Sequence, residues 1–381
     1  MLVGRVQAFR KHTLFRVYNG RVSESPRRPT IALAGGGHAN LYTLRRTGEL
    51  VGRGFDVVLI DPAEHLHYSG METGVLSGSH EPGENRIDIR CLVERGGGRF
   101  VRGRVAEVLY RERALVLEDG LIVPYDAVSF CVGSGTPARD GAIPVKPIAN
   151  LERVRETLLA PVPDAPRVLV VGGGAAGCEV AANVVGLLRG GKMTLVEAEP
   201  DLLPTSPRAA RRVMLERLRG PGVEVVLGQN ANLQPGAAVL RDGTKIEADL
   251  VLAATGVSPP GLFRRSRLAT GDDGALWVNR HLQSPNDAGI FGGGDAVAFR
   301  GARLPQFGVF AVRQGPVLYH NLQAVLWDEP LRPYKPQNHY LYVLDLGDGT
   351  GLAIYGPLTW RGRLALRIKH HIDKRFVKEF S

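Results

Sequence analysis

Two stretches of the chain repeat one pattern of hydrophobic and polar positions. Residues 31–40 and 168–177 each begin with an apolar run of strand length, continue through a cluster of glycines, and end in a stretch compatible with a helix. Continuous apolar runs are typical of strands buried in a parallel sheet, and glycine lets the backbone turn sharply into the next element. The pattern therefore predicts two strand–turn–helix units, whose first glycines, Gly35 and Gly172, lie 137 positions apart.

A second apolar run, ending in an acidic residue, follows each unit. Residues 55–61 end at Asp61, and residues 193–197 end at Glu197. In a dinucleotide-binding unit the glycine turn and helix N-terminus hold the pyrophosphate, while a carboxylate at the end of the next strand accepts hydrogen bonds from the adenosine ribose. Two such units in one chain favour two dinucleotides bound together, with electron transfer between them.

The repeat extends beyond the glycine turns. Aspartate–glycine pairs predict hairpin turns at residues 118–120 and 241–243, and apolar closing strands follow at residues 127–132 and 249–256. A third glycine turn, within residues 289–298, indicates that the chain returns to the first lobe. Its Asp295 can accept hydrogen bonds from ribityl or sugar hydroxyls, or it can cap a helix.

The length of 381 residues exceeds what one compact core usually holds. The motif order predicts an α/β fold with two nested Rossmann-like dinucleotide-binding domains and a C-terminal amphipathic helical segment. We assign residues 30–145 and 275–325 to the first domain and residues 146–274 to the second. A basic tail, residues 1–29, precedes them, and an interface segment, residues 326–381, follows.

The segment from Thr359 to Ser381 predicts a basic amphipathic helix. Apolar residues recur at intervals of four, with basic residues on the other side; they are Trp360, Leu364, Ile368, Ile372, Phe376 and Phe380. At about 100° per residue this row drifts gradually around a helix. Such a helix can lie in a membrane interface, or it can pack on the body of the protein or on a second subunit, as in a homodimer, and the sequence leaves these alternatives open.

The net charge of +10 is concentrated at the two ends of the chain. Residues 1–29 carry +6, residues 361–381 carry +5, and the remainder carries −1. A neutral body disfavours nucleic-acid binding, whereas basic ends fit an anionic membrane surface. No apolar run approaches the ~20 residues that cross a bilayer, so we expect a cytoplasmic protein that can associate peripherally with a membrane. The basic tail is also compatible with an organellar transit peptide, a flexible extension or a wrongly assigned start.

Three cysteines, Cys91, Cys131 and Cys178, are too few and too scattered for a disulfide framework or a zinc site. The sequence therefore predicts a reducing compartment and no metal site. No two cysteines lie close together in the sequence, so we do not expect the redox-active pair of a disulfide reductase.

Together these motifs resemble the pyridine nucleotide-disulfide oxidoreductase superfamily. Within it, the chain is most similar to type II NADH dehydrogenases and to the flavoprotein module sometimes fused ahead of selenide, water dikinase. The resemblance covers residues 30–381. Besides the two glycine turns it rests on Tyr68–Ser–Gly–Met71, Ile143–Pro–Val–Lys146–Pro147, Gly292–Gly–Gly–Asp295, Gly308–Val–Phe–Ala–Val–Arg–Gln314–Gly315 and Ile372–Asp–Lys–Arg–Phe376.

The resemblance implies FAD in the first domain and NADH in the second. The residues implied for FAD are Gly35, Gly37, His38, Ala39, Asp61, Val105, Gly133, Gly294 and Asp295. Those implied for NADH are Gly172, Gly174, Gly177, Glu197 and Gly256. NADPH is less favoured because no arginine directly follows Glu197, although Arg208, Arg211 and Arg212 could fold back.

Three residues are candidates for a catalytic role. The resemblance places Gln314 near flavin and quinone, where it can hydrogen-bond a quinone carbonyl or satisfy a backbone group at a helix start. It places Glu179 near the nicotinamide–flavin contact; the alternative is a structural ion pair with a lysine, for which Lys146 is one candidate. Lys146 is the third candidate, and His67 and Tyr68 are expected to approach the flavin.

The resemblance implies an FAD-dependent NAD(P)H oxidoreductase that passes a hydride from NADH to FAD and then electrons to a quinone. Sulfide:quinone reductases share the fold but use a C-terminal cysteine that this chain lacks. Two alternatives remain: a reductase of a soluble sulfur- or selenium-linked acceptor, and a flavin-carrying binding or assembly protein with little turnover.

Overall fold

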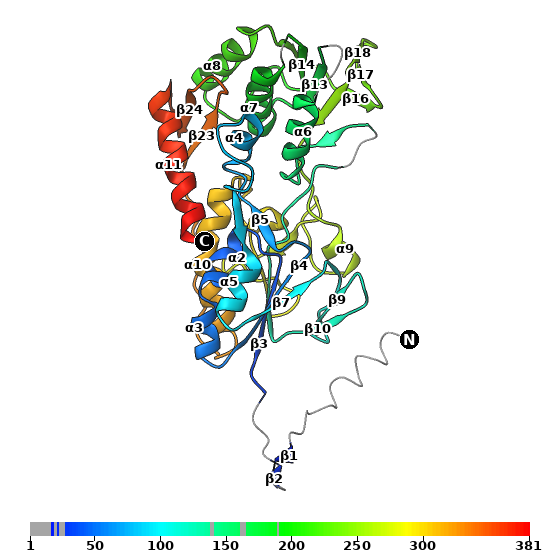
Figure 1. Cartoon of the computed structure of the whole chain (residues 1–381). Coiled ribbons are helices and arrows are strands. Elements are labelled where there is room, and N and C mark those ends of the chain that lie inside the picture. Colours follow the sequence, from blue (N-terminus) through cyan, green and yellow to red (C-terminus); the bar gives the residue numbers. More distant parts are fainter. Residues whose placement is uncertain (1–16, 19–20, 23–26, 138–140, 161–164, 189) are drawn as a thin grey trace.

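The computed structural model describes residues 17–18, 21–22, 27–137, 141–160, 165–188 and 190–381. Most of the basic tail lies outside these residues, and so do the alternatives of a transit peptide and a flexible extension. Within the tail, β1 (Val17–Tyr18) pairs with β2 (Arg21–Val22). The rest forms two α/β lobes, stacked end to end in Figure 1, with the last helix running along one side of both.

The first lobe contains a parallel sheet of five strands in the order β21-β11-β3-β4-β7. Its strands are β3 (Thr30–Ala34), β4 (Asp56–Asp61), β7 (Arg99–Arg102), β11 (Ala127–Phe130) and β21 (Ile290–Gly292). The helices of its first half are α2 (His38–Arg45), α3 (Thr47–Gly52) and α5 (Ile89–Arg95). Strand β3 is buried along its whole length, as its continuous apolar run predicts.

The second lobe repeats this plan with the order β12-β19-β13-β14-β15, again all parallel. Its strands are β12 (Ile143–Pro144), β13 (Arg167–Val171), β14 (Lys192–Glu197), β15 (Glu224–Leu227) and β19 (Leu250–Ala253). Its helices are α6 (Asn150–Leu159), α7 (Ala175–Val184), the short 3-10 helix η1 (Val185–Leu187) and α8 (Arg208–Arg219). The predicted α/β fold with two Rossmann-like domains is confirmed.

Each lobe also carries a three-stranded antiparallel sheet. In the first lobe it consists of β8 (Val105–Leu109), β9 (Ala114–Leu117) and β10 (Ile122–Pro124). In the second it consists of β16 (Ala231–Gln234), β17 (Ala237–Leu240) and β18 (Lys245–Glu247). Asp119 and Asp242 each accept a hydrogen bond from the backbone N–H two residues later, so both predicted hairpin turns are confirmed.

The boundaries between the lobes differ from those expected. Strand β12 pairs with β19, so the second lobe takes in residues before 146. Helix α9 (Leu262–Arg265) contributes Leu262 and Phe263 to the core of the first lobe, so the chain has returned there before residue 275. The chain re-enters the first lobe where these apolar side chains are buried. No glycine motif stands at this point, so the sequence pattern did not predict it.

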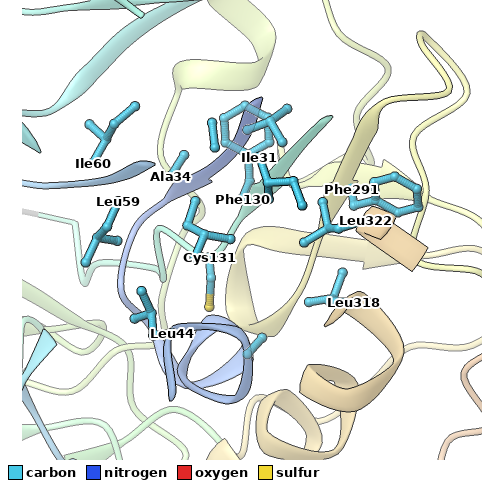
Figure 2. Packing of buried hydrophobic residues seen from close by; sticks show 14 of the residues in the cluster. Ile31, Ala34, Leu44, Leu59, Ile60, Phe130, Cys131, Phe291, Leu318 and Leu322 are labelled. Carbon is cyan, nitrogen blue, oxygen red and sulfur yellow. The ribbon is translucent and has the colours of Figure 1, made fainter. Parts of the chain in front are cut away.

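The returning chain completes the first lobe. Strands β20 (Leu276–Val278) and β22 (Val297–Phe299) pair in parallel, and the 3-10 helix η2 (Gly294–Ala296) leads directly into β22. Helix α10 (Gly308–Ala324) then packs on α2. Figure 2 shows Leu322 of α10 beside Phe291, and Leu318 and Cys131 belong to the same buried core.

A hairpin-like pair and a short helix lie where the two lobes meet. Strands β5 (His65–His67) and β6 (Arg86–Asp88) are antiparallel, and α4 (Glu72–Ser77) lies between them in the sequence. Helix α4 belongs to the first lobe by sequence but packs on α6 and α7 of the second.

The C-terminal segment packs on both lobes. It forms an antiparallel sheet of β23 (Leu341–Asp345), β24 (Gly351–Tyr355) and β25 (Leu358–Gly362), followed by α11 (Arg363–Glu379). The expected helix start at Thr359 is wrong, because residues 358–362 pair with β24 as a strand. Leu352 is buried in the second core, whereas Val377 and Phe380 are buried in the first.

Candidate functional site

The first glycine turn approaches strand β11 too closely for any larger residue. Gly35 has φ of +88°, and a Cβ there would overlap the carbonyl of Cys131. A Cβ on Gly37 would lie 2.7 Å from Cys131 Sγ. The N–H of Gly36 donates to Asp61 Oδ2 at 2.7 Å, which joins the turn to the end of β4. The turn and the predicted acidic partner therefore form one unit that fits a dinucleotide pyrophosphate and ribose.

The second glycine turn has the same construction. Gly172 has φ of +110°, and a Cβ there would overlap the carbonyl of Ala254. The N–H of Gly173 donates to Glu197 Oε2, while Glu197 Oε1 accepts from the N–H of Glu199 at 2.8 Å. The two lobes thus use equivalent backbone–carboxylate contacts.

A cavity of about 560 Å³ opens at this second turn. Four of the five residues predicted for NADH line it: Gly172, Gly174, Glu197 and Gly256. Gly174 and Gly256 face open space, since no described atom lies within 4 Å of where a Cβ would be. Gly177 does not line the cavity; a Cβ there would overlap the carbonyl of Gly172, so it allows helix α7 to start close to the turn.

The start of α2 lies at the equivalent position in the first lobe. His38 begins the helix, and burial lowers its pKa to about 4, so its imidazole is neutral near pH 7. Its Nε2 has no hydrogen-bond partner among the described residues. Asn40, which stands where the first motif lacks a third glycine, donates its side-chain N–H to the carbonyl of Gly35 at 2.8 Å and so holds the turn.

The remaining residues predicted for FAD come from α2, from β8 and from two later glycine-containing turns. Ala39 is fully buried in α2, and Val105 is buried at the start of β8. Gly133 has φ of +66° and no described atom within 4 Å of a Cβ position, so it lies against open space. Gly294 donates its N–H to Gln314 Oε1 at 2.7 Å.

Gln314 is a buried residue in the middle of α10. Its carbonyl oxygen satisfies the Gly294 N–H, which is the backbone role given as one of its two alternatives. It does not stand at the helix start as expected, because α10 begins six residues earlier, at Gly308. Gln314 therefore positions the third glycine turn.

Lys146 links the two lobes. Its Nζ lies 2.7 Å from Asp295 Oδ2, and the same oxygen accepts a hydrogen bond from Ser134 Oγ at 2.9 Å. Lys146 also lines the 560 Å³ cavity of the second lobe. A cation at this junction lies between the cavity and the residues predicted to hold the flavin.

Glu179 does not pair with Lys146; the lysine beside it is Lys369, so the partner named for the alternative ion pair differs from the one expected. Its carboxylate accepts from the N–H of Asp345 at 2.8 Å, and the neighbouring cation is Lys369 of α11. Burial raises the pKa of Glu179 to about 7, although the charge of Lys369 and the Asp345 hydrogen bond oppose the rise. The reason is topological: α7 packs on β23 and Glu179 lies near Lys369 of α11, whereas Lys146 is held at Asp295.

Sequence reasoning missed the cluster that accompanies Glu179. Lys369 Nζ lies 2.9 Å from Asp373 Oδ2, and Tyr68 Oη donates to Asp373 Oδ1 at 3.0 Å. Both charged side chains are at most 10% exposed. The available signal was their spacing of four in a helix otherwise assigned a solvent-facing basic side.

The cysteines do not form a redox pair. All three are free thiols, and burial raises the pKa of Cys131 to about 12, so it stays protonated. Cys178 is also buried and donates its thiol to the carbonyl of Gly173 at 3.1 Å. Both have packing roles.

Two parallel sheets, each with a glycine turn joined to an acidic strand end, define a protein of the class that binds two dinucleotides. The sequence profile of the pyridine nucleotide-disulphide oxidoreductase family matches residues 29–315. The chain belongs to this family.

Proteins of known function resemble the chain over most of its length. Ferroptosis suppressor protein 1 of Taeniopygia guttata is 27% identical over 315 residues, which cover 77% of this chain and 81% of that protein. Demethylphylloquinone reductase NdbB of Synechocystis sp. is 25% identical over 363 residues, which cover 87% of this chain and 89% of that protein.

Solved structures share the fold at lower identity. The sulfide:quinone oxidoreductase of Aquifex aeolicus matches with a TM-score of 0.79 and 15% identity, covering 92% of this chain and 91% of that one. NDH2 from Plasmodium falciparum in complex with NADH matches with a TM-score of 0.78 and 14% identity, covering 92% and 96%.

Proposed function

We propose that this protein oxidises NADH with a bound FAD and passes the electrons to a quinone. The observation that carries the proposal is the duplicated glycine–carboxylate unit, Gly36 with Asp61 and Gly173 with Glu197, in lobes joined by Lys146 and Asp295. The relative named as a demethylphylloquinone reductase supports a quinone as the acceptor.

FAD fits the first lobe. The glycine turn is packed as closely on Cys131 as a pyrophosphate-binding turn requires, and Asp61 retains acceptor capacity for ribose hydroxyls besides its contacts with the N–H groups of Gly36 and Ala63. Asp295 and Ser134 would hold the ribityl hydroxyls, and Gln314 keeps Gly294 in place. When bound, the flavin supplies the two-electron chemistry.

NADH fits the second lobe better than NADPH. The Glu197 carboxylate would meet the adenosine ribose and repel a 2′-phosphate. Arg211, one of three arginines that could have reversed this preference, instead bonds Asp201 and the carbonyls of Pro204 and Ser206. This arrangement supports the choice of NADH.

Glu179 and Lys369 are suited to hold protons for the acceptor. Reduction of a quinone to a quinol takes up two protons, and a carboxyl whose pKa is raised to about 7 can exchange one near neutral pH. Lys369 and Asp373 connect Glu179 to Tyr68, which stacks on Phe376 with ring centroids 4.6 Å apart. We propose this aromatic and charged cluster as the acceptor side of the site.

A peripheral membrane contact would bring a lipid-soluble quinone to that side. Exposed apolar residues lie at the end of β24, along β25 and at the start of α11: Tyr355, Leu358, Trp360 and Leu364. Arg361, Arg363 and Arg367 accompany them in the sequence and would favour anionic lipid. Within the described residues, no helix combines the length and apolar character needed to span a membrane.

Purified protein would test the proposal directly. We expect a yellow protein that bleaches when NADH is added without oxygen and regains its colour with a short-chain quinone. Bleaching without recovery by quinone would instead support a soluble sulfur- or selenium-linked acceptor. Colour without bleaching would support a flavin-carrying binding protein, and a colourless protein that takes up no added FAD would contradict the proposal.

A further inference from the structure

Three side chains with metal-binding atoms meet between the lobes. His67 ends β5, Glu72 begins α4, and Glu152 comes from α6 of the second lobe. His67 Nδ1 lies 3.7 Å from Glu152 Oε1 and 3.9 Å from Glu72 Oε2, and one ligand atom from each residue lies within 4.8 Å of the others. We propose that this cluster binds a divalent transition-metal cation such as Zn²⁺ and so ties the two lobes together.

The separations suit a metal ion after a small contraction. Zinc lies about 2.0–2.2 Å from imidazole nitrogen and carboxylate oxygen, so tetrahedral ligand atoms are roughly 3.4 Å apart. The two measured separations from His67 Nδ1 exceed this by only a few tenths of an ångström. Ordinary rotamer adjustment of His67 and Glu152, which are both partly exposed, can close that gap.

Unpaired buried acceptors provide a second, independent reason. Glu72 is fully buried, and its Oε1 has no hydrogen-bond partner among the described residues. Asn85, also fully buried, donates to Glu72 Oε2 while its own Oδ1 lacks a described partner. His67 Nδ1 is unpaired as well. Burying a carboxylate with an unsatisfied oxygen is costly unless a cation or a donor compensates it.

Ligand chemistry selects the class of ion. A neutral imidazole nitrogen with carboxylate oxygens suits zinc and its transition-metal neighbours better than calcium or magnesium, which prefer all-oxygen sites. Since three protein ligands leave a position for water, the fourth ligand need not come from the chain.

Arg86 competes with the cation. Its Nη2 lies 2.8 Å from Glu152 Oε2, and the guanidinium places a positive charge beside the cluster. The side chain is 41% exposed, so it can turn into solvent when Glu152 binds a metal. Removing the guanidinium should therefore strengthen metal binding, which a merely structural ion pair would not predict.

The test uses full-length holoprotein without a histidine tag, dialysed against a chelator and titrated with ZnCl₂ by calorimetry. We expect one equivalent to bind and to raise the melting temperature. His67→Ala and Glu152→Gln should each weaken zinc binding at least tenfold, and Arg86→Ala should strengthen it.

His65→Ala is the matched control, because His65 lies two residues earlier on the same strand, near Asp88 at the surface. It should bind zinc like the unaltered protein. Equal zinc binding by the His65 and His67 variants would overturn the proposal. So would the absence of zinc binding by the unaltered protein at pH 7.5, which would leave a proton or a water molecule as the occupant of the cluster. Neither result bears on the NADH-dependent bleaching that tests the proposed function.

Discussion

Lys146 Nζ lies 2.7 Å from Asp295 Oδ2, and this ion pair joins the start of one nucleotide lobe to the last glycine turn of the other. The two residues are 149 positions apart. The contact matters because the lysine lines the cavity proposed for the nicotinamide dinucleotide, whereas the aspartate belongs to the turn proposed for FAD. A positive charge at this junction would stabilise extra electron density on a neighbouring flavin.

Replacing Lys146 with Met should therefore lower the flavin midpoint potential. We expect a fall of roughly 30 mV, which for a two-electron couple corresponds to about 1.4 kcal/mol. Lys146→Arg keeps the charge and should stay near the original potential. Spectroelectrochemical titration of both proteins would check this, and equal potentials for the Met and Arg variants would remove Lys146 from the flavin environment.

Glu197→Gln should relax the preference for NADH. The amide loses the negative charge that repels a 2′-phosphate, while its oxygen can still accept from the N–H of Gly173. We expect the KM for NADPH to fall about tenfold, a change of roughly 1.4 kcal/mol, with a smaller rise for NADH. Steady-state kinetics with both nucleotides measure this. An unchanged ratio of kcat/KM values would show that Glu197 lies away from the ribose.

Two glycines of the second turn should respond differently to alanine. A methyl group at Gly174 meets no described atom within 4 Å, so Gly174→Ala should fold normally but weaken NADH binding, by about tenfold or more, because it fills space next to the pyrophosphate. A methyl group at Gly177 would overlap the Gly172 carbonyl, so Gly177→Ala should lower the melting temperature. Thermal unfolding and NADH titration of each variant separate the two effects. Equal melting temperatures for the two variants would contradict the packing role given to Gly177.

Glu179→Gln should change how stability depends on pH. The pKa of Glu179 is raised from 4.5 to about 7 by burial, so the folded protein holds this proton more tightly than the unfolded chain does. The stabilisation is complete below about pH 4.5 and is lost as the pH rises toward 7, an effect on the order of 1–3 kcal/mol. From pH 5 to pH 8 the unfolding free energy of the unaltered protein should therefore fall by more than that of the Gln variant. Chemical denaturation at several pH values measures both. If the unfolding free energies of the two proteins change equally with pH, the pKa of Glu179 is not raised.

Membrane association should depend on two exposed leucines, one in β25 and one at the start of α11. Leu358 and Leu364 are 63% and 66% exposed, and each leucine buried in lipid contributes roughly 1.5–3 kcal/mol. The double change to Ser should reduce binding to anionic liposomes at least tenfold without altering turnover with a water-soluble quinone. Leu121→Ser, an exposed position in the first-lobe hairpin turn, is the control. Deleting residues 361–381 is a poor test, because it removes Val377 and Phe380 from the core. If the double variant sediments with liposomes as fully as the unaltered protein, this surface is not the membrane contact.

Local sequence patterns were sufficient for much of the fold. The apolar runs and glycine turns predicted strands β3 and β13, because a buried strand and a sharp turn depend on residues next to one another. The hairpin turns at Asp119 and Asp242 followed for the same reason. By contrast, the helix expected from Thr359 begins at Arg363, since pairing with β24 outweighs the helical spacing of Trp360.

The sequence by itself determined two nucleotide lobes, their glycine turns and their acidic strand ends, since these depend on short-range geometry and burial. Only the tertiary structure decided which charges meet: Lys146 with Asp295, Glu179 with Lys369, and His67 with Glu152. Each of these contacts joins residues more than 80 positions apart. The residue type alone determines whether a side chain can be charged. Which partner it meets depends on how the lobes pack against each other, and no local sequence pattern predicts that packing.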